Sequence, residues 1–219
     1  EARTWERVAA VLDATPFFDG TAVRQTLAAI PENSIVFVGN SMPVRHVDTF
    51  DQPSTRPITF FGNRGASGID GNVSTALGIA AATGCPVTAI LGDITFYHDM
   101  NGLLAVRQHA LQNITFVVVN NDGGGIFHRL PVAVHEPPFT DLFLTPHGLT
   151  FEHAAAMYGL RYAAVYDEAE LEAELRNNTV TTGVARIIEI KTNSTTDYSH
   201  MRAVSAAVIE GLETTPVKS

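Results

Sequence analysis

Six short apolar runs rich in β-branched residues recur along the chain, and the segments between them have the pattern of helices. The runs lie at residues 34–39, 57–62, 86–92, 114–120, 161–166 and 184–190. Each run is continuously apolar rather than alternating, which is typical of strands buried on both faces of a parallel sheet. This alternation predicts an α/β fold of three layers, α/β/α, around a mostly parallel six-stranded sheet.

Three intervening segments carry clear helix signals. A proline opens segment 43–50, and an alanine-rich segment occupies 151–160. Asp70 is placed to cap a helix that ends before Gly84. Residues 130–148 contain four prolines and are predicted to form a long loop, a candidate lid.

Composition bounds the domain organisation and the classes of partner. The length suits a single domain over residues 1–219, with two leading amphipathic helices in 1–33 that pack on it and carry no evident chemistry. Acidic residues outnumber basic ones by 23 to 14, and Lys and Arg do not cluster, which argues against nucleic acid as a partner. The single cysteine, Cys85, and apolar runs far shorter than the ~20 residues of a membrane span predict a cytoplasmic location. Because the chain opens at Glu1, we expect a piece of a longer protein.

An acidic residue and an amide follow two successive apolar runs. Asp93 comes directly after 86–92, and Asn121 directly after 114–120. The separation of 28 residues (121 − 93) allows a crossover helix and a parallel return, so both side chains are expected at the edge where open α/β sheets bind ligands. Carboxylate and amide oxygens suit Mg²⁺, which completes its coordination with phosphate oxygens and water. Gly92 lets the backbone approach a phosphate and Gly123 can turn its carbonyl to the metal, so the pattern predicts a diphosphate–Mg²⁺ site.

Each candidate also has a plain structural interpretation. Asp93 can simply cap the next helix, although its pairing with Asn-Asn-Asp-Gly-Gly at this distance favours the metal site. Arg64 can brace a glycine-rich turn, Arg45 can be a solvated surface residue, and Ile69 can be ordinary core. The eight histidines show no compact metal-ligand spacing and are interpreted as hydrogen-bonded or surface residues, with His98 nearest the site in sequence. GNRGASG is not the dinucleotide fingerprint, so NAD binding is disfavoured.

The sequence motifs around these residues resemble those of a known family. Gly-Asp, a helix and then Asn-Asn is similar to the motif of thiamine-diphosphate enzymes, usually written GDG ending in NN, although this chain has Gly-Asp-Ile. The chain resembles one family of these enzymes, the 2-succinyl-5-enolpyruvyl-6-hydroxy-3-cyclohexene-1-carboxylate (SEPHCHC) synthases of menaquinone biosynthesis. The matching segments are GNSMPVR (39–45), NRGASGIDG (63–71), GDITFYHDMNGL (92–103), NNDGGGIF (120–127) and FEHAAAMYGL (151–160). The resemblance covers about 34–190 and corresponds to the C-terminal diphosphate-binding domain of the family.

The resemblance implies cofactor-binding roles for two sets of residues. The positions that match the family's Mg²⁺ ligands are Asp93, Asn121 and the carbonyl of Gly123. The positions that match the surroundings of the diphosphate are Gly92, Ile94, Asn40 and Ser41. The implied cofactors are thiamine diphosphate and Mg²⁺, which Mn²⁺ can replace.

The resemblance also implies substrate-side roles. Ile69 matches the bulky residue under the thiazolium ring, which keeps the cofactor bent. Arg45 and Arg64, with Ser41, match the groups that receive the distal carboxylate of 2-oxoglutarate, and bidentate arginine suits a carboxylate. Ile126 and Phe127 match the apolar wall near isochorismate, the second substrate.

The implied reaction is decarboxylation of 2-oxoglutarate followed by addition of the carbanion to isochorismate, with the cofactor supplying the difficult chemistry. In the family, the activating glutamate lies on the pyrimidine-binding domain of a partner subunit. The resemblance therefore implies a homodimer or homotetramer, and a chain that is inactive alone.

Two rival functions are weighed against this one. Another thiamine-diphosphate 2-oxo-acid enzyme, of the acetolactate synthase or decarboxylase type, would use pyruvate, and the paired arginines argue against it. A non-catalytic diphosphate-binding module has the same fold but no need of a dicarboxylate clamp.

Overall fold

A parallel sheet of six strands forms the centre of the computed structural model, which describes residues 2–177 and 183–213. The strand order is β2-β1-β3-β4-β6-β5, and every pairing is parallel. The strands are β1 (Ile35–Val38), β2 (Thr59–Phe61), β3 (Val87–Gly92), β4 (Ile114–Asn120), β5 (Arg161–Val165) and β6 (Arg186–Lys191). Each predicted apolar run overlaps one of them, with β6 ending one residue beyond its run, so the predicted parallel sheet is confirmed. Burial on both faces holds for the inner strands only, because all three residues of the edge strand β2 are exposed.

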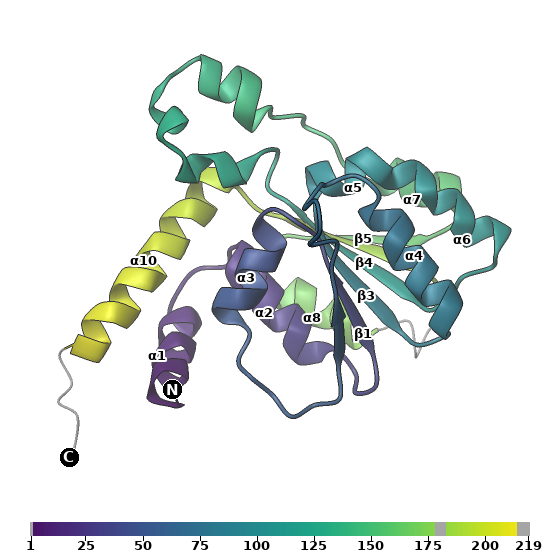
Figure 1. The fold of residues 1–219 in the computed structure, drawn as a ribbon, viewed down its shortest axis with the longest axis horizontal. Helices are drawn as coiled ribbons and strands as arrows, with labels where there is room; N and C mark the ends of the chain where they lie inside the picture. The colour runs from purple at the N-terminus through teal and green to yellow at the C-terminus, as the bar shows by residue number, and fades with distance from the viewer. Residues whose placement is uncertain (1, 178–182, 214–219) are drawn as a thin grey trace.

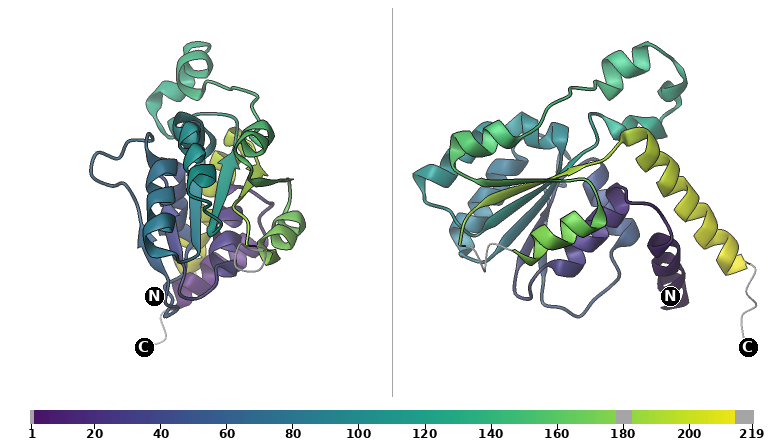
Figure 2. Two further views of the ribbon diagram at one scale, coloured as in Figure 1. Left: turned by 90° about the vertical axis from the view of Figure 1, so that its right-hand side faces the viewer. Right: turned by 180° about the vertical axis from the view of Figure 1, so that it is seen from behind.

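Helices cover both faces of the sheet (Figures 1 and 2). Side chains alternate along each strand, so Phe37 and Leu91 pack with one helical layer, and Val36 and Ile90 with the other. The first layer contains α4 (Asn72–Thr83), α5 (Asp93–Asp99), α6 (Leu104–Gln108) and α7 (Glu152–Tyr158). The second contains α2 (Asp19–Ala29), α3 (Met42–Phe50) and α8 (Glu168–Arg176). The three-layer α/β/α fold is therefore confirmed.

The first and last helices lie outside these layers. Helix α1 (Ala2–Asp13) packs against α10 (Ser194–Glu213), where Leu12 joins an apolar cluster with Met201 and Val204 (Figure 1). Of the two helices predicted within residues 1–33, α2 thus lies on the sheet and α1 lies on α10.

Helix ends test the predicted caps. Helix α4 ends at a left-handed Gly84 with φ of 67°, which confirms the predicted stop. Its predicted cap, Asp70, is wrong, because the helix begins at Asn72 and Gly71, with φ of 65°, occupies the capping position. The Asn72 side chain instead donates to the carbonyls of Gly68 and Asp70 and holds this turn.

The segment between β4 and α7 stands away from the body of the molecule, at the top of Figure 1. It contains the short helices η2 (Gly125–Arg129), η3 (Pro131–Val134) and η4 (Thr140–Leu144), while η1 (Met100–Leu103) lies between α5 and α6. The predicted loop at 130–148 is therefore partly helical.

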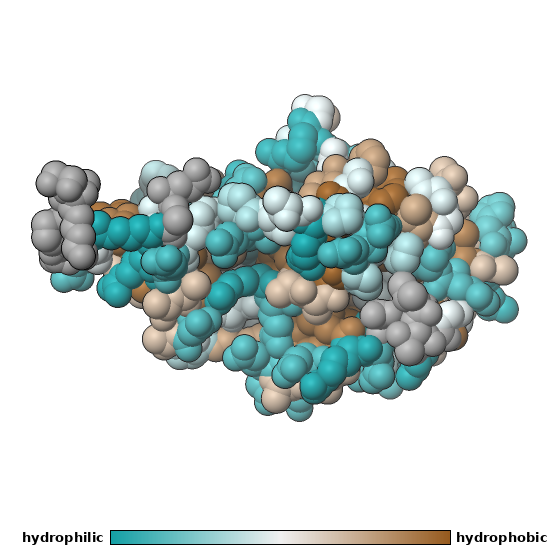
Figure 3. Space-filling view, turned by 90° about the horizontal axis from the view of Figure 1, so that it is seen from below, coloured by the Kyte–Doolittle hydropathy of each residue, from teal (hydrophilic) through white to brown (hydrophobic). Residues whose placement is uncertain are grey.

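The surface mixes polar and apolar side chains, as the view from below shows (Figure 3). Scattered apolar groups are ordinary on folded domains. Among residues 2–177 and 183–213, no helix combines the length and apolarity needed to cross a membrane.

Candidate functional site

A cavity of about 520 Å³ opens at the carboxyl edge of the sheet, beyond the ends of β1, β3 and β4. Because β3 and β4 are neighbours, with Gly92 paired to Val119, the residues that follow them enter the same cavity. Of the predicted site residues, those that line it are Ser41, Arg45, Arg64, Ile69, Gly92, Asp93, Ile94, Asn121, Gly123, Ile126 and Phe127.

Asn40 lies behind the cavity wall rather than in it. Its side chain is buried, and its Nδ2 donates to the carbonyls of Asn63 and Gly68 at 3.0 and 2.6 Å. Its Oδ1 accepts a hydrogen bond from Arg64 Nη1 at 2.6 Å. Asn40 thus braces the glycine-rich turn and the arginine that faces the cavity.

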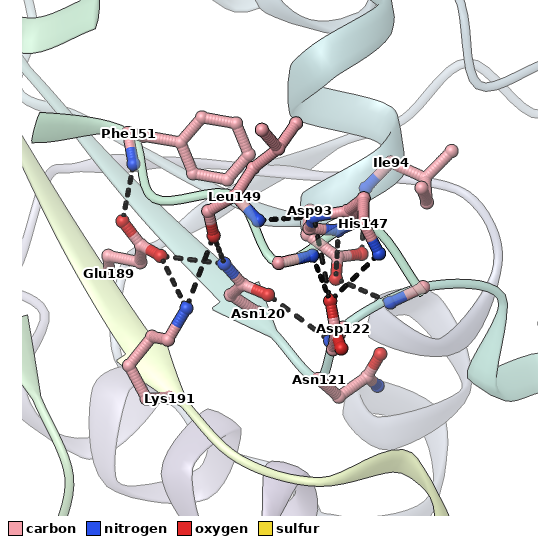
Figure 4. A network of polar contacts seen from close by, with 12 residues as sticks. Asp93, Ile94, Asn120, Asn121, Asp122, His147, Leu149, Phe151, Glu189 and Lys191 are labelled. Atoms are coloured by element: carbon pink, nitrogen blue, oxygen red, sulfur yellow. Dashed lines mark hydrogen bonds and ion pairs between the residues drawn. The ribbon is translucent and has the colours of Figure 1, made fainter. Parts of the chain in front are cut away.

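The Asp93 carboxylate links the end of β3 to the loop after β4 (Figure 4). The residue is 2% exposed, and its Oδ1 accepts from the Ile94 N–H at 2.7 Å. Its Oδ2 accepts from the Gly123 N–H at 2.9 Å and lies 3.1 Å from His147 Nε2. These contacts reach beyond helix α5, to the segments that follow β4 and precede α7.

Asn121 lines the cavity and carries an unused acceptor. The residue is 7% exposed, and its Nδ2 donates to Asp19 Oδ2 at 2.8 Å. Its Oδ1 is buried and has no hydrogen-bond partner within the described residues. An unpaired buried oxygen of this kind is costly unless a ligand binds it.

Gly123 approaches the facing chain too closely for any side chain. Its φ is 131°, and an added Cβ would lie 2.0 Å from the Leu144 carbonyl oxygen. Its own carbonyl accepts from the Gly125 N–H at 2.9 Å, which leaves a second lone pair. Together with Asp93 and Asn121 it offers hard oxygen donors that fit Mg²⁺. The described part of the chain holds no cluster of three His, Cys, Asp or Glu suited to a metal, so a cation here needs further oxygens such as those of a phosphate.

The lining of the same cavity also carries two arginines, Arg45 and Arg64. Arg45 Nη1 donates to the Ser41 carbonyl, and Arg64 donates to Asn40. A guanidinium has five N–H groups, so both side chains keep donors for a ligand. The cavity therefore combines carboxylate and amide oxygens with a pair of cationic side chains.

His147 fastens the projecting segment to this site. Its ring contacts Asp93, and that hydrogen bond raises the pKa of the imidazole. The backbone N–H groups of His147 and Gly148 both donate to Asp122 Oδ1, at 3.0 and 2.7 Å. Two histidines therefore reach the site, His147 through Asp93 and His46 in the cavity lining, whereas His98 is merely nearest in sequence.

A buried polar cluster beside Asn121 was missed by the sequence reasoning. It contains Asp19 from α2, His46 from α3 and Asp197 from α10. Burial raises the pKa of both aspartates, with a further contribution from neighbouring carboxylates. Burial and the nearby Arg129 lower the pKa of His46 to about 3. One signal was available, because Asp19 occupies the same helical face as the buried Val23 and other apolar residues of α2.

Residues 44–190 match the model of the family described as thiamine pyrophosphate enzyme, C-terminal TPP-binding domain. The chain belongs to this family. Thiamine pyrophosphate is another name for thiamine diphosphate. The cofactor class implied by the motifs that contain Asp93 and Asn121 is therefore confirmed.

Curated members of the family are similar over most of this chain. Proteins named 2-succinyl-5-enolpyruvyl-6-hydroxy-3-cyclohexene-1-carboxylate synthase include one from Roseiflexus sp. (strain RS-1), 52% identical over 97% of this chain and 37% of that protein. Another, from Natronomonas pharaonis, is 45% identical over 89% of this chain and 33% of that protein. The predicted resemblance is confirmed, and the chain spans about a third of the length of the curated relatives it matches.

Two solved structures share the fold. A structure from Mycobacterium smegmatis, assigned to the thiamin diphosphate-dependent enzymes, has a TM-score of 0.65 at 26% identity and covers 81% of this chain and 32% of that chain. Benzoylformate decarboxylase from Polynucleobacter necessarius also has a TM-score of 0.65, at 18% identity, over 82% of this chain and 34% of that chain. The second likeness concerns the fold alone.

Proposed function

We propose that this chain is the diphosphate- and Mg²⁺-binding domain of a SEPHCHC synthase, a transferase of menaquinone biosynthesis. The enzyme would decarboxylate 2-oxoglutarate and add the carbanion to isochorismate. One observation carries the proposal: the cavity that holds the oxygens of Asp93 and Asn121 also holds Arg45 and Arg64. A site for a pyruvate-type substrate has no use for two arginines, and the names of the curated relatives point the same way.

In this proposal, the residues that follow β3 and β4 bind the cofactor. Asp93, Asn121 and the Gly123 carbonyl hold Mg²⁺ or Mn²⁺, and Gly92, Ile94 and Ser41 border the diphosphate. Ile69 supports the thiazolium ring. Thiamine diphosphate, when bound, supplies the carbanion chemistry that decarboxylation of a 2-oxo acid requires.

The arginine wall binds and orients the first substrate. Arg45 and Arg64, with the Ser41 hydroxyl, receive the distal carboxylate of 2-oxoglutarate through charge-assisted hydrogen bonds. Ile126 and Phe127 form the apolar side that faces isochorismate and excludes water from the reacting carbon.

The assembly is part of the proposal. No glutamate of the described residues lines the cavity, so we assign the activating glutamate to the pyrimidine-binding domain of a partner subunit in a homodimer or homotetramer. A cytoplasmic location fits the lone free thiol of Cys85.

Substitution of the arginines tests the substrate assignment in the complete protein. Arg45→Ala or Arg64→Ala should raise the KM for 2-oxoglutarate much more than the KM for isochorismate. Loss of one charge-assisted hydrogen bond costs about 1.5–3 kcal/mol, or about 10- to 150-fold in binding. Discrimination against pyruvate, which has no distal carboxylate, should shrink in both variants.

Arg107→Ala is the matched control, because Arg107 is an exposed arginine outside the cavity that donates to the Met157 carbonyl. Its KM values should match the wild type. If the cavity variants kept their oxoglutarate-to-pyruvate preference and lost only thermal stability, the arginines would be turn braces and the substrate assignment would be wrong.

A further inference from the structure

Asp19 is a buried carboxylate in contact with Asn121, one of the proposed metal ligands. It lies in the first turn of α2, is 0% exposed and lines the cavity. Its Oδ2 accepts from Asn121 Nδ2 at 2.8 Å, and its Oδ1 accepts from Thr192 Oγ1 at 2.5 Å. Asp19 thus joins α2 to the segments that follow β4 and β6.

The contact with Asp19 determines how the Asn121 amide is oriented. An ionised carboxylate only accepts hydrogen bonds, so the amide NH₂ must face Asp19 and the amide oxygen must face away. That oxygen is one of six buried side-chain atoms without a hydrogen-bond partner in the described chain. Without Asp19, the two ends of the amide would be free to exchange places.

Close packing restricts the same amide from another side. A Cβ added to Gly125 would lie 3.0 Å from Asn121 Nδ2 and 3.4 Å from Asn121 Oδ1. Any side chain larger than that of Gly125 would therefore press on the amide. Packing leaves the amide little free space on this side, and the contact with Asp19 decides which end of the amide faces away from the carboxylate.

Asp19 also lies outside the part of the chain that matches the family model, residues 44–190. Burial of a carboxylate is unfavourable unless hydrogen bonds compensate it, and one of the two side-chain donors to Asp19 is the amide of Asn121. Resting on the proposed function, we propose that Asp19 is a positioning residue that fixes Asn121 with its Oδ1 toward the bound cation.

The test measures cation affinity rather than turnover. In the complete protein with thiamine diphosphate, free Mn²⁺ is counted by electron paramagnetic resonance for the wild type and for Asp19→Asn. The new amide can donate to Asn121 Oδ1 and turn it from the cavity, so the Mn²⁺ affinity should fall about 10- to 100-fold, as when other partners of metal ligands are lost. Thermal melts of both proteins identify any loss of fold.

Two further variants separate positioning from packing. Thr192→Val removes the other hydrogen bond to Asp19 but leaves the Asn121 contact, so its Mn²⁺ affinity should stay within about threefold of the wild type. The exchange Asp19→Asn with Asn121→Asp again leaves an oxygen at position 121 free for the cation, now that of a carboxylate, and should restore Mn²⁺ binding, even if Asp19→Asn alone fails to fold.

The outcomes distinguish this inference from the proposed function. If Asp93→Asn loses Mn²⁺ while Asp19→Asn binds it like the wild type, Asp19 has no positioning role. A folded exchange variant that does not bind Mn²⁺ overturns the inference as well. If the wild type itself shows no cofactor-dependent Mn²⁺ binding, the proposed function is wrong.

Discussion

Asn120 and Asn121 are consecutive, yet their side chains enter two regions with opposite hydrogen-bonding character (Figure 4). Asn120 Nδ2 donates to Glu189 Oε1 at 2.6 Å and to the Leu149 carbonyl at 3.0 Å, and its Oδ1 accepts from the Asp122 N–H. Asn121 donates to Asp19 but keeps its Oδ1 buried and unpaired in the described structure. Both ends of the Asn120 amide are hydrogen-bonded, whereas the oxygen of the Asn121 amide is available to a ligand.

The carboxylates beside the two amides differ in the same way. Glu189 is 0% exposed, and each of its oxygens accepts two hydrogen bonds, with donors from Asn120, Lys191, Tyr162 and the Phe151 N–H. On the other side, Asp93 and Asp19 face one cavity together with the open oxygen of Asn121. A saturated buried carboxylate serves stability, whereas an incompletely paired cluster of acceptors is suited to a cation.

Removal of the saturated carboxylate should have the largest effect. Glu189→Ala deletes the acceptor of four donors and leaves Lys191 without its carboxylate, so the unfolding free energy should fall by about 3–5 kcal/mol. Urea denaturation of the complete protein measures the loss. The Mn²⁺ affinity of the protein that remains folded should not change, and a selective loss of Mn²⁺ with normal stability would erase the distinction between the two regions.

Asp93→Asn should show the reverse pattern. Loss of the anionic ligand should weaken cofactor-dependent Mn²⁺ binding by about 100-fold or more, which corresponds to about 2.7 kcal/mol. Activity should disappear at ordinary Mg²⁺ concentrations. Stability should fall less than in Glu189→Ala, by about 1–3 kcal/mol, because the new NH₂ leaves one backbone N–H without its acceptor while the variant keeps the shape of the side chain and relieves the repulsion from Asp19. Thiamine-diphosphate affinity equal to the wild type by calorimetry would return Asp93 to the role of a helix cap.

The open region, which consists of Asp93, Asp19 and Asn121, could be predicted from sequence only where its residues follow neighbouring strands. Asp93 and Asn121 come together because parallel strands that pair side by side end at the same edge of the sheet, and the apolar runs identify both strands. The Asp19 contact with Asn121 spans 102 residues, and its contact with Thr192 spans 173. Local patterns do not tell which helix face lies at which strand end, so Asp19 resembled an ordinary helix-start residue.

The saturated region, which is Glu189 with its four donors, was not predicted from the sequence for a related reason. Glu189 interrupts the apolar run at 184–190, and its partner Tyr162 lies in another run on the neighbouring strand β5. The sheet order that brings them together, with β6 between β4 and β5, depends on how the helices cross over. The Gly84 helix stop needed only local backbone chemistry and was predicted correctly, whereas the position of a cap beside Asp70 depended on the turn held by Asn72.

The smallest change examines how much redundancy the saturated region has. Tyr162→Phe removes one hydroxyl, whose hydrogen bond to Glu189 Oε2 is 2.9 Å long, and leaves the Phe151 N–H on the same oxygen at 2.8 Å. Because Tyr162 is only half-buried, water can replace part of the lost contact. The unfolding free energy, measured by urea denaturation as for Glu189→Ala, should fall by about 1 kcal/mol. Mn²⁺ affinity should be unchanged. A loss as large as that of Glu189→Ala would mean that the four donors act as one cooperative unit, and that the stability of this region does not come from separate hydrogen bonds.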